Sequence, residues 1–564
     1  MTYRSSTMVS SMVVMLALQA CGGSVATATP NASGVRPALP REYVDTTVKA
    51  SPGRTLAVPA GGDLQAMLDE AQPGDEIVLT AGARYKGPYT LPYKKDGEGW
   101  ITIRSSGVGK DFPSPGSRVQ PSQAGRMAAL VSNEQGVIVA ERRAHHYRFI
   151  GIEIAPEANS FLRDLVLLGD NTGRSIDDLP HHIILDRCYV HGEPKKGARR
   201  GVVMNGRHMG VIDSYVSGFR EDGQDSQAVA GWGGSGPFKV ENNFLEGAGE
   251  NILFGGGDPS IKDLVPSDIE IRRNHVAKPL SWKPGEPEHD GGNWQVKILL
   301  ELKNARRVLV DGNIFEYNWQ RPGYGFAITF TVRNEEGRSP WAMIEDVTFT
   351  NNIVRHSPSG VNIMGSDDIH PPSGQGQRFL IKNNIFDDIN GPRWGGKGRL
   401  FQLLRGTKHV VIEHNVGFHT GHILMASGDP HEGFIYRYNI TPHNEYGMEG
   451  DGTGVGRPTL ERHFPGAVVT HNMMIGGDVY ADRYSEDNEF PRSVEAVPFI
   501  NPAAGDYRLA SANGALTASP GRELPGIDAT ALCAALGDNG RTEAVCSKPL
   551  PQDRRIPSRS AKTE

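Results

Sequence analysis

A short phrase built around asparagine recurs along the middle of this chain and limits what the chain can fold into. An apolar residue is followed by two variable residues, then usually Asn, one more residue and often a second apolar residue. Neighbouring Asn slots are separated by 24 residues (415 to 439) to 39 residues (313 to 352), which is typical of the turns of a solenoid. The slots are held by Cys188, Ser214, Asn243, Asn274, Asn313, Asn352, Asn384, Asn415, Asn439 and Asn472.

Each unit of this repeat predicts one coil of a stacked all-β solenoid. A single coil cannot bury its apolar face alone, but stacked coils share one continuous core. Asn side chains at the same corner of successive coils can hydrogen-bond along the stack, which satisfies amides that would otherwise be costly to bury. Asn-rich turns in a β-sandwich are the alternative, but accidental turns would not keep a register over ten copies. The sequence therefore predicts a single-stranded parallel β-helix.

The first 45 residues predict export. Residues 1–21 resemble a bacterial lipoprotein-type signal peptide, with Arg4 before a short apolar stretch and Leu-Gln-Ala before Cys21. Cys21 would then carry the lipid, and Gly22 favours the outer membrane, with the chain periplasmic or at the cell surface. An ordinary signal peptide cut nearby is the alternative, and it too places the chain outside the cytoplasm. Residues 22–45 are predicted to be a flexible tether, so that the chain meets the membrane only through its lipid anchor.

The predicted β-helix spans residues 46–510. Asp63 begins a helical apolar pattern over residues 63–71, which predicts a helix that caps the open end of the core. Residues 511–546 are predicted to cover the other end, and residues 547–564 to be disordered. Cys533 and Cys546 predict a disulfide in an exported chain, whereas Cys188 is expected in the core. Long loops are predicted at 275–294, 317–324, 335–342, 366–376 and 442–464.

Composition excludes one class of partner. The 564 residues carry a net charge of −6, so no global basic surface for nucleic acid is expected. Any recognition of an acidic partner must be local. The chain is expected to be a monomer.

Two cations occupy matching positions on neighbouring coils. Lys303 and Arg333 each end a strand just before an Asn, and alternation along the strands points both outward. We expect them about 4.8 Å apart at the backbone, facing an anionic ligand. The pKa of a Lys falls beside another cation, which suits proton abstraction next to a carboxylate. A solvated strand face is the plainer interpretation of the same pattern.

The Asn ladder, the capping helix and export together resemble the right-handed parallel β-helix (pectate-lyase-like) superfamily, over residues 60–510. More narrowly, Lys303-Asn-Ala followed one coil later by Val-Arg333-Asn is similar to the alginate lyases and chondroitinase-B-like polysaccharide lyases. The resemblance implies that Lys303 is the catalytic base and Arg333 its partner in charge neutralisation. It also implies cleavage of an acidic, uronate-containing polysaccharide by β-elimination.

Calcium is the cofactor that this resemblance implies. The family's calcium-binding acids lie upstream of its Lys, where this chain has Val296 and Ile298. Glu250 and Asn251 one coil earlier are then the candidate metal ligands, and Glu301 either orients Lys303 or binds the cation.

Further residues are predicted to hold the sugar chain. A cation is expected to bind a neighbouring acidic sugar, and loop aromatics are expected to stack on sugar rings, although they could instead pack loop bases. These predicted contacts are Arg405, Lys297, Trp294, Trp319 and Tyr324.

Two other functions stay open. A glycoside hydrolase needs two carboxylates that flank the bond, for which Glu221, Asp225, Glu250 and Asp258 are candidates. A non-catalytic surface adhesin or glycan-binding protein would use the same aromatic loops. No histidine in the long loops has metal-ligand spacing, so a transition-metal site is not expected there.

Overall fold

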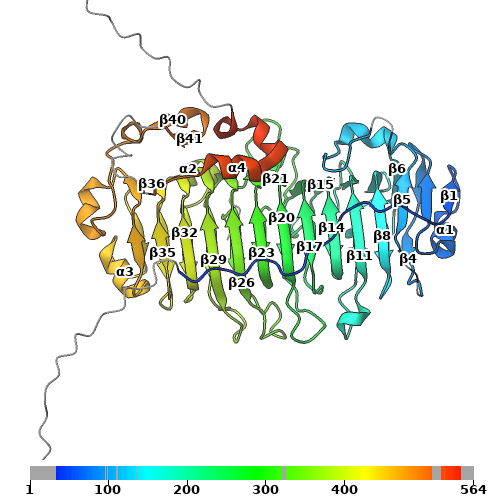
Figure 1. Cartoon of the computed structure of the whole chain (residues 1–564), viewed down its shortest axis with the longest axis horizontal. Coiled ribbons are helices and arrows are strands. Elements are labelled where there is room, and N and C mark those ends of the chain that lie inside the picture. The colour runs from blue at the N-terminus through cyan, green and yellow to red at the C-terminus, as the bar shows by residue number, and fades with distance from the viewer. Residues whose placement is uncertain are drawn as a thin grey trace, which may run out of the picture. The chain divides into compact units, whose positions relative to one another are not determined.

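The computed structural model describes residues 34–547, except 96, 98, 110–111, 135, 320–324 and 511–522. The signal peptide, Cys21, Tyr324 and nearly all of the predicted C-terminal tail lie outside these residues. The described residues form one compact unit, in which each coil contributes one strand to each of three all-parallel sheets (Figure 1). The prediction of a parallel β-helix is confirmed. Among the described residues, no helix is long and apolar enough to cross a bilayer.

Sheet A has 14 strands. Their bounds are β1 (Thr55–Val58), β2 (Glu76–Leu79), β5 (Ile101–Ser105), β8 (His145–Ile150), β11 (His181–Asp186), β14 (Arg207–Ile212), β17 (Phe238–Glu241), β20 (Ser267–Arg272), β23 (Ala305–Asp311), β26 (Ile344–Thr350), β29 (Gly376–Lys382), β32 (Lys408–Glu413), β35 (Ile435–Arg437) and β38 (Val468–Thr470).

Sheet B has 13 strands. Their bounds are β3 (Arg84–Lys86), β6 (Ala128–Ser132), β9 (Ile152–Pro156), β12 (Tyr189–His191), β15 (Tyr215–Phe219), β18 (Phe244–Gly247), β21 (His275–Ala277), β24 (Ile314–Glu316), β27 (Ile353–Ser357), β30 (Ile385–Ile389), β33 (Val416–His419), β36 (Ile440–Pro442) and β39 (Met473–Ile475).

Sheet C has 12 strands. Their bounds are β4 (Tyr89–Leu91), β7 (Ile138–Ala140), β10 (Asp164–Leu168), β13 (Arg200–Met204), β16 (Gln227–Gly231), β19 (Glu250–Phe254), β22 (Ile298–Leu302), β25 (Ile328–Thr331), β28 (Val361–Met364), β31 (Phe401–Leu404), β34 (Leu424–Ser427) and β37 (Met448–Gly450). The pair β40 (Phe499–Asn501) and β41 (Asp506–Leu509) is antiparallel.

The asparagine ladder turns each coil from sheet A into sheet B. The backbone N–H of Asn274 donates to Oδ1 of Asn313 at 2.9 Å, and Asn313 repeats this bond to Asn352. The ladder continues through the two substituted slots, because the N–H of Cys188 donates to Oγ of Ser214 at 2.9 Å. The residue before each slot has a positive φ, for example +55° at Asn351. The predicted ladder is confirmed.

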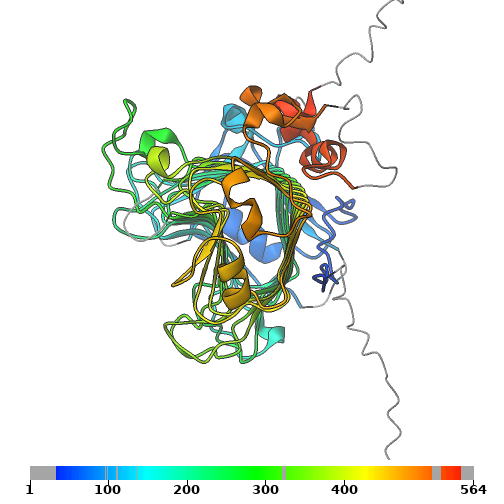
Figure 2. The same ribbon diagram turned by 90° about the vertical axis from the view of Figure 1, so that its left-hand side faces the viewer.

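The described residues include four α-helices beside the coils: α1 (Leu64–Glu70), α2 (Gly391–Trp394), α3 (Arg457–His463) and α4 (Ala529–Leu536). Asp63 caps α1 by accepting a hydrogen bond from the N–H of Ala66, and α1 buries Leu64 and Leu68 in the main core beside β1. That α1 seals this end stays a prediction. At the opposite end, Figure 2 shows α3 over the last coils, where Phe464 packs on Phe434.

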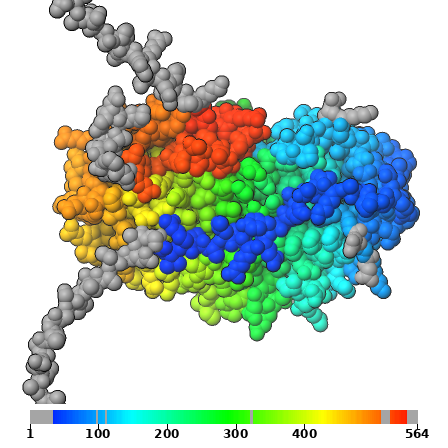
Figure 3. All heavy atoms as spheres, viewed as in Figure 1, coloured from blue at the N-terminus to red at the C-terminus, as the bar shows by residue number. Residues whose placement is uncertain are grey.

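An N-terminal strap (residues 34–49) lies along the outer face of sheet A, as the dark blue band in Figure 3 shows. Arg36 makes two hydrogen bonds to the carboxylate of Glu413, at 3.0 and 3.1 Å. Val44 packs on Ile184 and Ile212. These contacts contradict the prediction of a flexible tether for residues 34–45, because the outward side chains of sheet A provide both charges and an apolar patch for the strap.

A C-terminal arm (residues 523–547) lies on sheet B, although the sequence predicts that it covers the end of the stack. Leu532 and Leu536 of α4 pack on an outward apolar stripe of sheet B. The predicted disulfide is present, with Cys533 and Cys546 joined at a Cα separation of 5.5 Å. The arm lies on sheet B because this stripe stays apolar over six consecutive strands: Ile314, Ile353, Ile385, Val416, Ile440 and Met473.

Candidate functional site

The strap lies on the outer face of sheet A and the arm lies on sheet B. The outer face of sheet C is therefore the face on which a ligand could bind. A row of outward polar side chains crosses four neighbouring strands there, one residue from each strand in direct register. Apolar residues on either side of each of these four point into the core, so the alternation of the strands alone fixes the row. The row consists of Glu301, Thr329, Asn362 and Gln402.

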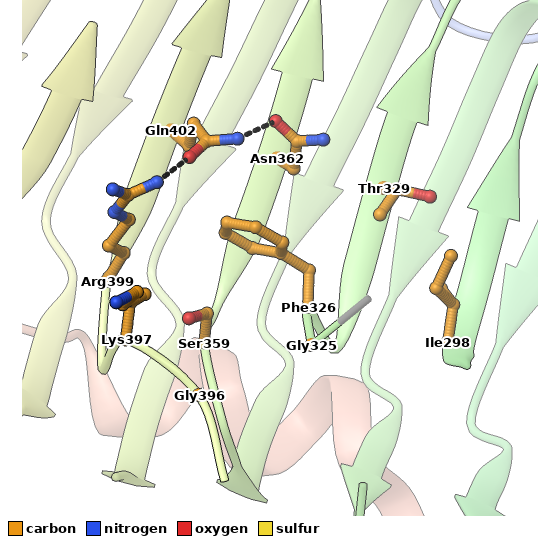
Figure 4. A pocket seen from close by; sticks show the side chains of 10 residues that line it. All are labelled: Ile298, Gly325, Phe326, Thr329, Ser359, Asn362, Gly396, Lys397, Arg399 and Gln402. Carbon is orange, nitrogen blue, oxygen red and sulfur yellow. Dashed lines mark hydrogen bonds between the residues drawn. The ribbon is translucent and has the colours of Figure 1, made fainter. Parts of the chain in front are cut away.

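A cavity of about 260 Å³ opens over this row. Its floor includes Thr329, Asn362 and Gln402, and Nε2 of Gln402 donates to Oδ1 of Asn362 at 3.1 Å (Figure 4). Phe326 projects into its centre from the loop before β25, while Arg399 lies at one side. The cavity thus combines an aromatic ring, two amides and two cations, a lining that can bind a polar ligand such as a sugar.

Two cations line this cavity, and a short helical turn places them there. Helix α2 is capped by Asn390 and ends at Gly395, whose positive φ of +83° turns the chain back towards sheet C. Lys397 and Arg399 follow in the loop before β31. Among the described residues, no carboxylate lies within ion-pairing distance of either cation. Arg399 donates to Oε1 of Gln402, and its Nε is buried with no hydrogen-bond partner in the described part of the chain.

Burial lowers the pKa of the half-buried Arg399, and Asp451 opposes this effect from a distance. A guanidinium that has lost part of its hydration and has no carboxylate partner gains more from an incoming anion than a paired one. This end of the cavity can therefore bind a carboxylate or a sulfate.

Glu301 lies next to the cavity in the outward row. Its Oε1 accepts a hydrogen bond from the hydroxyl of Thr329 at 3.4 Å, and its Oε2 has no hydrogen-bond partner among the described residues. Burial raises the pKa of Glu301 to about 7, although Lys303 opposes this effect. By contrast, burial of Glu250 is outweighed by Lys297, and the pKa of Glu250 is lowered. The pKa values of two neighbouring carboxyl groups are thus shifted in opposite directions.

The two cations predicted to work together are each paired with acids. Lys303 lies 3.2 Å from Glu335, and Arg333 binds both Asp367 and Asp368, at 2.9 and 2.5 Å. Their backbones are adjacent as predicted, since the N–H of Arg333 donates to the carbonyl of Lys303 at 2.9 Å.

The expected lowering of the Lys303 pKa is wrong. Burial disfavours the charged form of Lys303, but Glu301 and Glu335 outweigh burial and raise its pKa. The predicted sugar ligand Arg405 is exposed and lies 3.7 Å from Asp368, so it shares an acid with Arg333 on the same side of sheet C.

The predicted calcium ligands do not fit calcium. Oε1 of Glu250 lies 2.7 Å from Nζ of Lys297, which also binds Asp225 at 2.8 Å. Oδ1 of Asn251 accepts a hydrogen bond from Nζ of Lys278 at 2.8 Å. Protein ammonium groups therefore already contact the oxygens that a calcium ion would need, and Lys297 serves these acids rather than a sugar. We derive no step through calcium.

The tryptophans predicted to stack on sugars contact other protein side chains instead. Trp319 is 3% exposed and packs with Trp282 and Trp394 in a cluster beneath the loops. The guanidinium of Arg220 lies over the ring of Trp294 at 5.1 Å. The alternative that loop aromatics pack loop bases is therefore confirmed for Trp319, because these large rings bury more area against each other than a loop surface would allow.

Of the acids predicted for a hydrolase, Asp225 and Glu250 share the ammonium group of Lys297, whereas Glu221 and Asp258 have other partners. Glu221 lies 3.6 Å from Arg199, Asp225 binds Lys297, and Asp258 accepts a hydrogen bond from Ser339. Of these four acids, Glu250 is the one with a described neighbouring carboxyl group whose pKa is shifted in the opposite direction. Glu301 is its neighbour there.

The sequence reasoning did not identify the cavity residues Phe326, Lys397, Arg399, Gln402 and Asn362. A signal was available for the two amides, because each occupies an outward slot between apolar residues of a strand. Lys397 and Arg399 had none, since their lack of acidic partners depends on which loops meet over sheet C.

Comparison with known proteins finds distant structural likenesses. No family model matches the chain, and no curated protein matches it. The catalytic unit of a GH87 alpha-1,3-glucanase from Streptomyces thermodiastaticus is similar, with a TM-score of 0.47 and 12% identity over 80% of this chain and 71% of that one. The PL6 family alginate lyase AlyGC has a TM-score of 0.44 and 12% identity over 88% of this chain and 59% of that one.

A mannuronic acid specific polysaccharide family 6 lyase from human gut microbiota is also similar, with a TM-score of 0.40 and 13% identity, covering 78% of this chain and 84% of that one. The likenesses thus include both polysaccharide lyases and a glycoside hydrolase. At these scores they do not bear on the reaction of this chain. Its three all-parallel sheets make it a parallel β-helix.

Proposed function

We propose that this chain is an enzyme that cleaves an acidic, uronate-containing polysaccharide by β-elimination on the outer face of sheet C. One observation carries the proposal. Lys397 and Arg399 line a cavity on the available sheet face without a carboxylate partner among the described residues, whereas Lys303 and Arg333 are both paired. We therefore assign proton abstraction and charge neutralisation to Lys397 and Arg399 rather than to Lys303 and Arg333.

In this mechanism Arg399 binds the uronate carboxylate through its planar fork and neutralises its charge. The proton on C5 next to that carboxylate becomes more acidic and passes to the amine of Lys397 in its neutral form. The C5–H electron pair forms the C4–C5 double bond, the bond from C4 to the glycosidic oxygen breaks, and that oxygen takes a proton from water. Phe326 stacks on a sugar ring, while Gln402 and Asn362 hydrogen-bond its hydroxyl groups.

The experiment is a panel of alginate, pectate, glycosaminoglycans and bacterial exopolysaccharides. A lyase produces the ultraviolet absorbance of an unsaturated uronate. Arg399→Ala and Lys397→Ala are each expected to lower kcat/KM by about 100-fold, as loss of one preorganised charged donor does. Lys408→Ala, which removes an exposed Lys of sheet A paired with Glu432, is the matched control and should keep full activity. Unchanged activity in Arg399→Ala would overturn the proposal.

Hydrolysis is the second candidate, because the pKa of Glu301 is raised and that of its neighbour Glu250 is lowered. Such divergence is how an acid and a base are set apart in glycosidases. New reducing ends without the unsaturated product, abolished by Glu301→Gln but kept in Arg399→Ala, would establish it. Binding with neither product would indicate a glycan-binding protein.

We also propose that the chain is exported and anchored by a lipid on Cys21, because residues 1–21 resemble a lipoprotein-type signal peptide and the proposed substrate is extracellular. The test is fractionation of cells that express the wild-type chain or Cys21→Ser. The wild-type chain should sediment with the outer membrane, and the variant should be released in soluble form. Equal distribution of the two would contradict the anchor.

A further inference from the structure

Two His-His dipeptides lie one above the other on successive coils, remote from the cavity. His145 and His146 begin β8, and His181 and His182 begin β11, with His145 in register with His181. Within each dipeptide the two Nδ1 atoms are 2.8 Å apart. The rings also stack between coils, with centroids 4.9 Å apart for His145 and His181 and 4.5 Å apart for His146 and His182.

This stack concentrates nitrogen donors in one place. His146, His181 and His182 each offer one ring nitrogen, and these atoms all lie within 4.8 Å of one another. With metal–nitrogen bonds of about 2.0–2.1 Å, the donors around one ion lie roughly 3–4 Å apart. Small rotations of the three rings would therefore bring the nitrogens to a shared ion.

The surroundings hold the rings in place. Nε2 of His145 is 3.0 Å from the carbonyl of Lys94, so a proton on Nε2 leaves Nδ1 of His145 to accept from His146. Trp100 stands edge-on to His146 and His182, at 5.3 and 6.2 Å between ring centroids. Neighbours thus restrict the rings to small rotations, as in sites where outer contacts orient metal-binding imidazoles.

Burial and charge restrict which ion could bind. His146, His181 and His182 are each half-buried. Lys49 and Arg207 are nearby cations, and they oppose a positive ion. An ion held here must depend on donor strength rather than on attraction to acids, which favours ions that prefer imidazole over Ca²⁺ or Mg²⁺.

We propose that His146, His181 and His182 form a transition-metal site that binds Cu²⁺ most tightly and Zn²⁺ next, and that links strands β8 and β11. The site is independent of the reaction on sheet C. Its role is to clip two coils together through one ion, so that bound metal stabilises the N-terminal part of the stack.

The test uses the full chain without a polyhistidine tag, freed of metal with a chelator. Calorimetric titration should show one equivalent of Cu²⁺ or Zn²⁺ bound, none of Ca²⁺, and a Tm that rises with the metal. The Cu²⁺ electron paramagnetic resonance spectrum should show nitrogen hyperfine structure, and Cu²⁺ should quench the fluorescence of Trp100, as judged against Trp100→Phe.

The double variant His181→Ala/His182→Ala should lose at least tenfold in affinity. His409→Ala is the matched control, because His409 is also the second residue of a sheet A strand with a positive φ, +54° against +54° at His182. The single variant His146→Asn gives the same test if the double variant fails to fold. Absence of saturable Cu²⁺ and Zn²⁺ binding, or equal affinity in the wild type and a folded variant, would overturn the proposal.

Discussion

The cations near the outer face of sheet C form two groups, those paired with a carboxylate and those without one among the described residues. Lys303 and Arg333 already contact carboxylates, so an anionic ligand would have to displace an internal partner before binding either one. Within the part of the chain that the structure describes, Arg399 has only a side-chain amide as hydrogen-bond partner. Because a desolvated cation gains most where no competing acid is present, pairing state rather than residue type selects the anion site.

Lys303→Met tests this selection. We expect kcat/KM to stay within about threefold of the wild type, because the effect of a residue outside the reacting centre is well below that of a charged catalytic group. Lys397→Met, a substitution of the same shape on the other Lys, should give the larger loss. A hundredfold loss in Lys303→Met with an intact fold would restore Lys303 as the base.

Burial of Glu301 predicts a pH-dependent stability. Its pKa rises to about 7 in the folded chain, so the folded state holds the proton more tightly than the unfolded state does. This contribution to stability is present below the unfolded pKa and is lost as the pH rises through about 7. Glu301→Gln, which stays neutral, should therefore gain stability relative to wild type between pH 5 and pH 8, by up to about 3 kcal/mol.

Urea unfolding at the two pH values measures that difference. Glu345→Gln serves as the control, because Glu345 is a half-buried acid of sheet A paired with Arg378. A Glu301→Gln variant whose relative stability does not change with pH would show that Glu301 titrates normally.

The lysines at the predicted metal position predict that activity does not need calcium. Lys278 is fully buried and donates to Oδ1 of Asn251 and to four backbone carbonyls, while Lys297 binds Glu250. Prolonged treatment with EDTA should change kcat/KM less than twofold, and added Ca²⁺ should not raise it. Loss of activity in EDTA that Ca²⁺ alone restores would contradict this prediction.

At the scale of elements, the asparagine ladder links the coils by hydrogen bonds. Asn313 is fully buried, and it accepts from the N–H of Asn274 while donating to the carbonyl of Ile271. Asn313→Ala would leave both partners unpaired inside the stack, so we expect a loss of about 2–5 kcal/mol in the free energy of unfolding.

Denaturant unfolding checks this loss, with Asn501→Ala as the control because Asn501 is exposed and its side chain makes no capping hydrogen bond. Asn313→Asp should also be destabilising. A carboxylate can accept the hydrogen bond from the N–H of Asn274, but it cannot donate one to the carbonyl of Ile271. A loss no greater than that of the control would mean that the ladder amides add little to stability.

Strands and corners could be predicted from the sequence where a single repeat in the residue pattern determines their position. Alternation placed Leu300 and Leu302 in the core and Glu301 outward, and the recurring slot located the corner of every coil. The C-terminal arm was misplaced because its amphipathic helix could cover either an end or a side, and the apolar stripe on sheet B becomes visible only once the coils are in register. The unpaired state of Arg399 depends in the same way on loops that meet in space.

At the scale of the whole molecule, two chain ends occupy two sheets. The strap adds hydrogen bonds to carboxylates of sheet A that also pair with cations of the sheet itself, including Asp268, Asp346 and Glu413. The arm buries the apolar stripe of sheet B. Sheet C is left for function because its polar row and its long loops suit a ligand rather than a chain end.

Deletion of residues 34–49 should destabilise the stack by at least about 3 kcal/mol, because several hydrogen bonds to charged groups are lost. It should also expose Ile184 and Ile212, which favours association. Thermal unfolding and light scattering measure the two effects, with Arg36→Ala as a milder control. A deleted chain that unfolds at the wild-type temperature and stays monomeric would show that the strap adds nothing to the fold.

The partners of the strap also imply an order of folding for the newly synthesised chain. Arg41 finds its acid 227 positions later, Ala38 finds its acid 308 positions later, and Arg36 must wait 377 positions for Glu413. Residues made earlier therefore dock later, in reverse order, as each new coil winds into place. Contacts between residues so far apart in the sequence are slow to form. The strap therefore stays undocked until almost all of the coils have formed, and it then docks along them one contact after another.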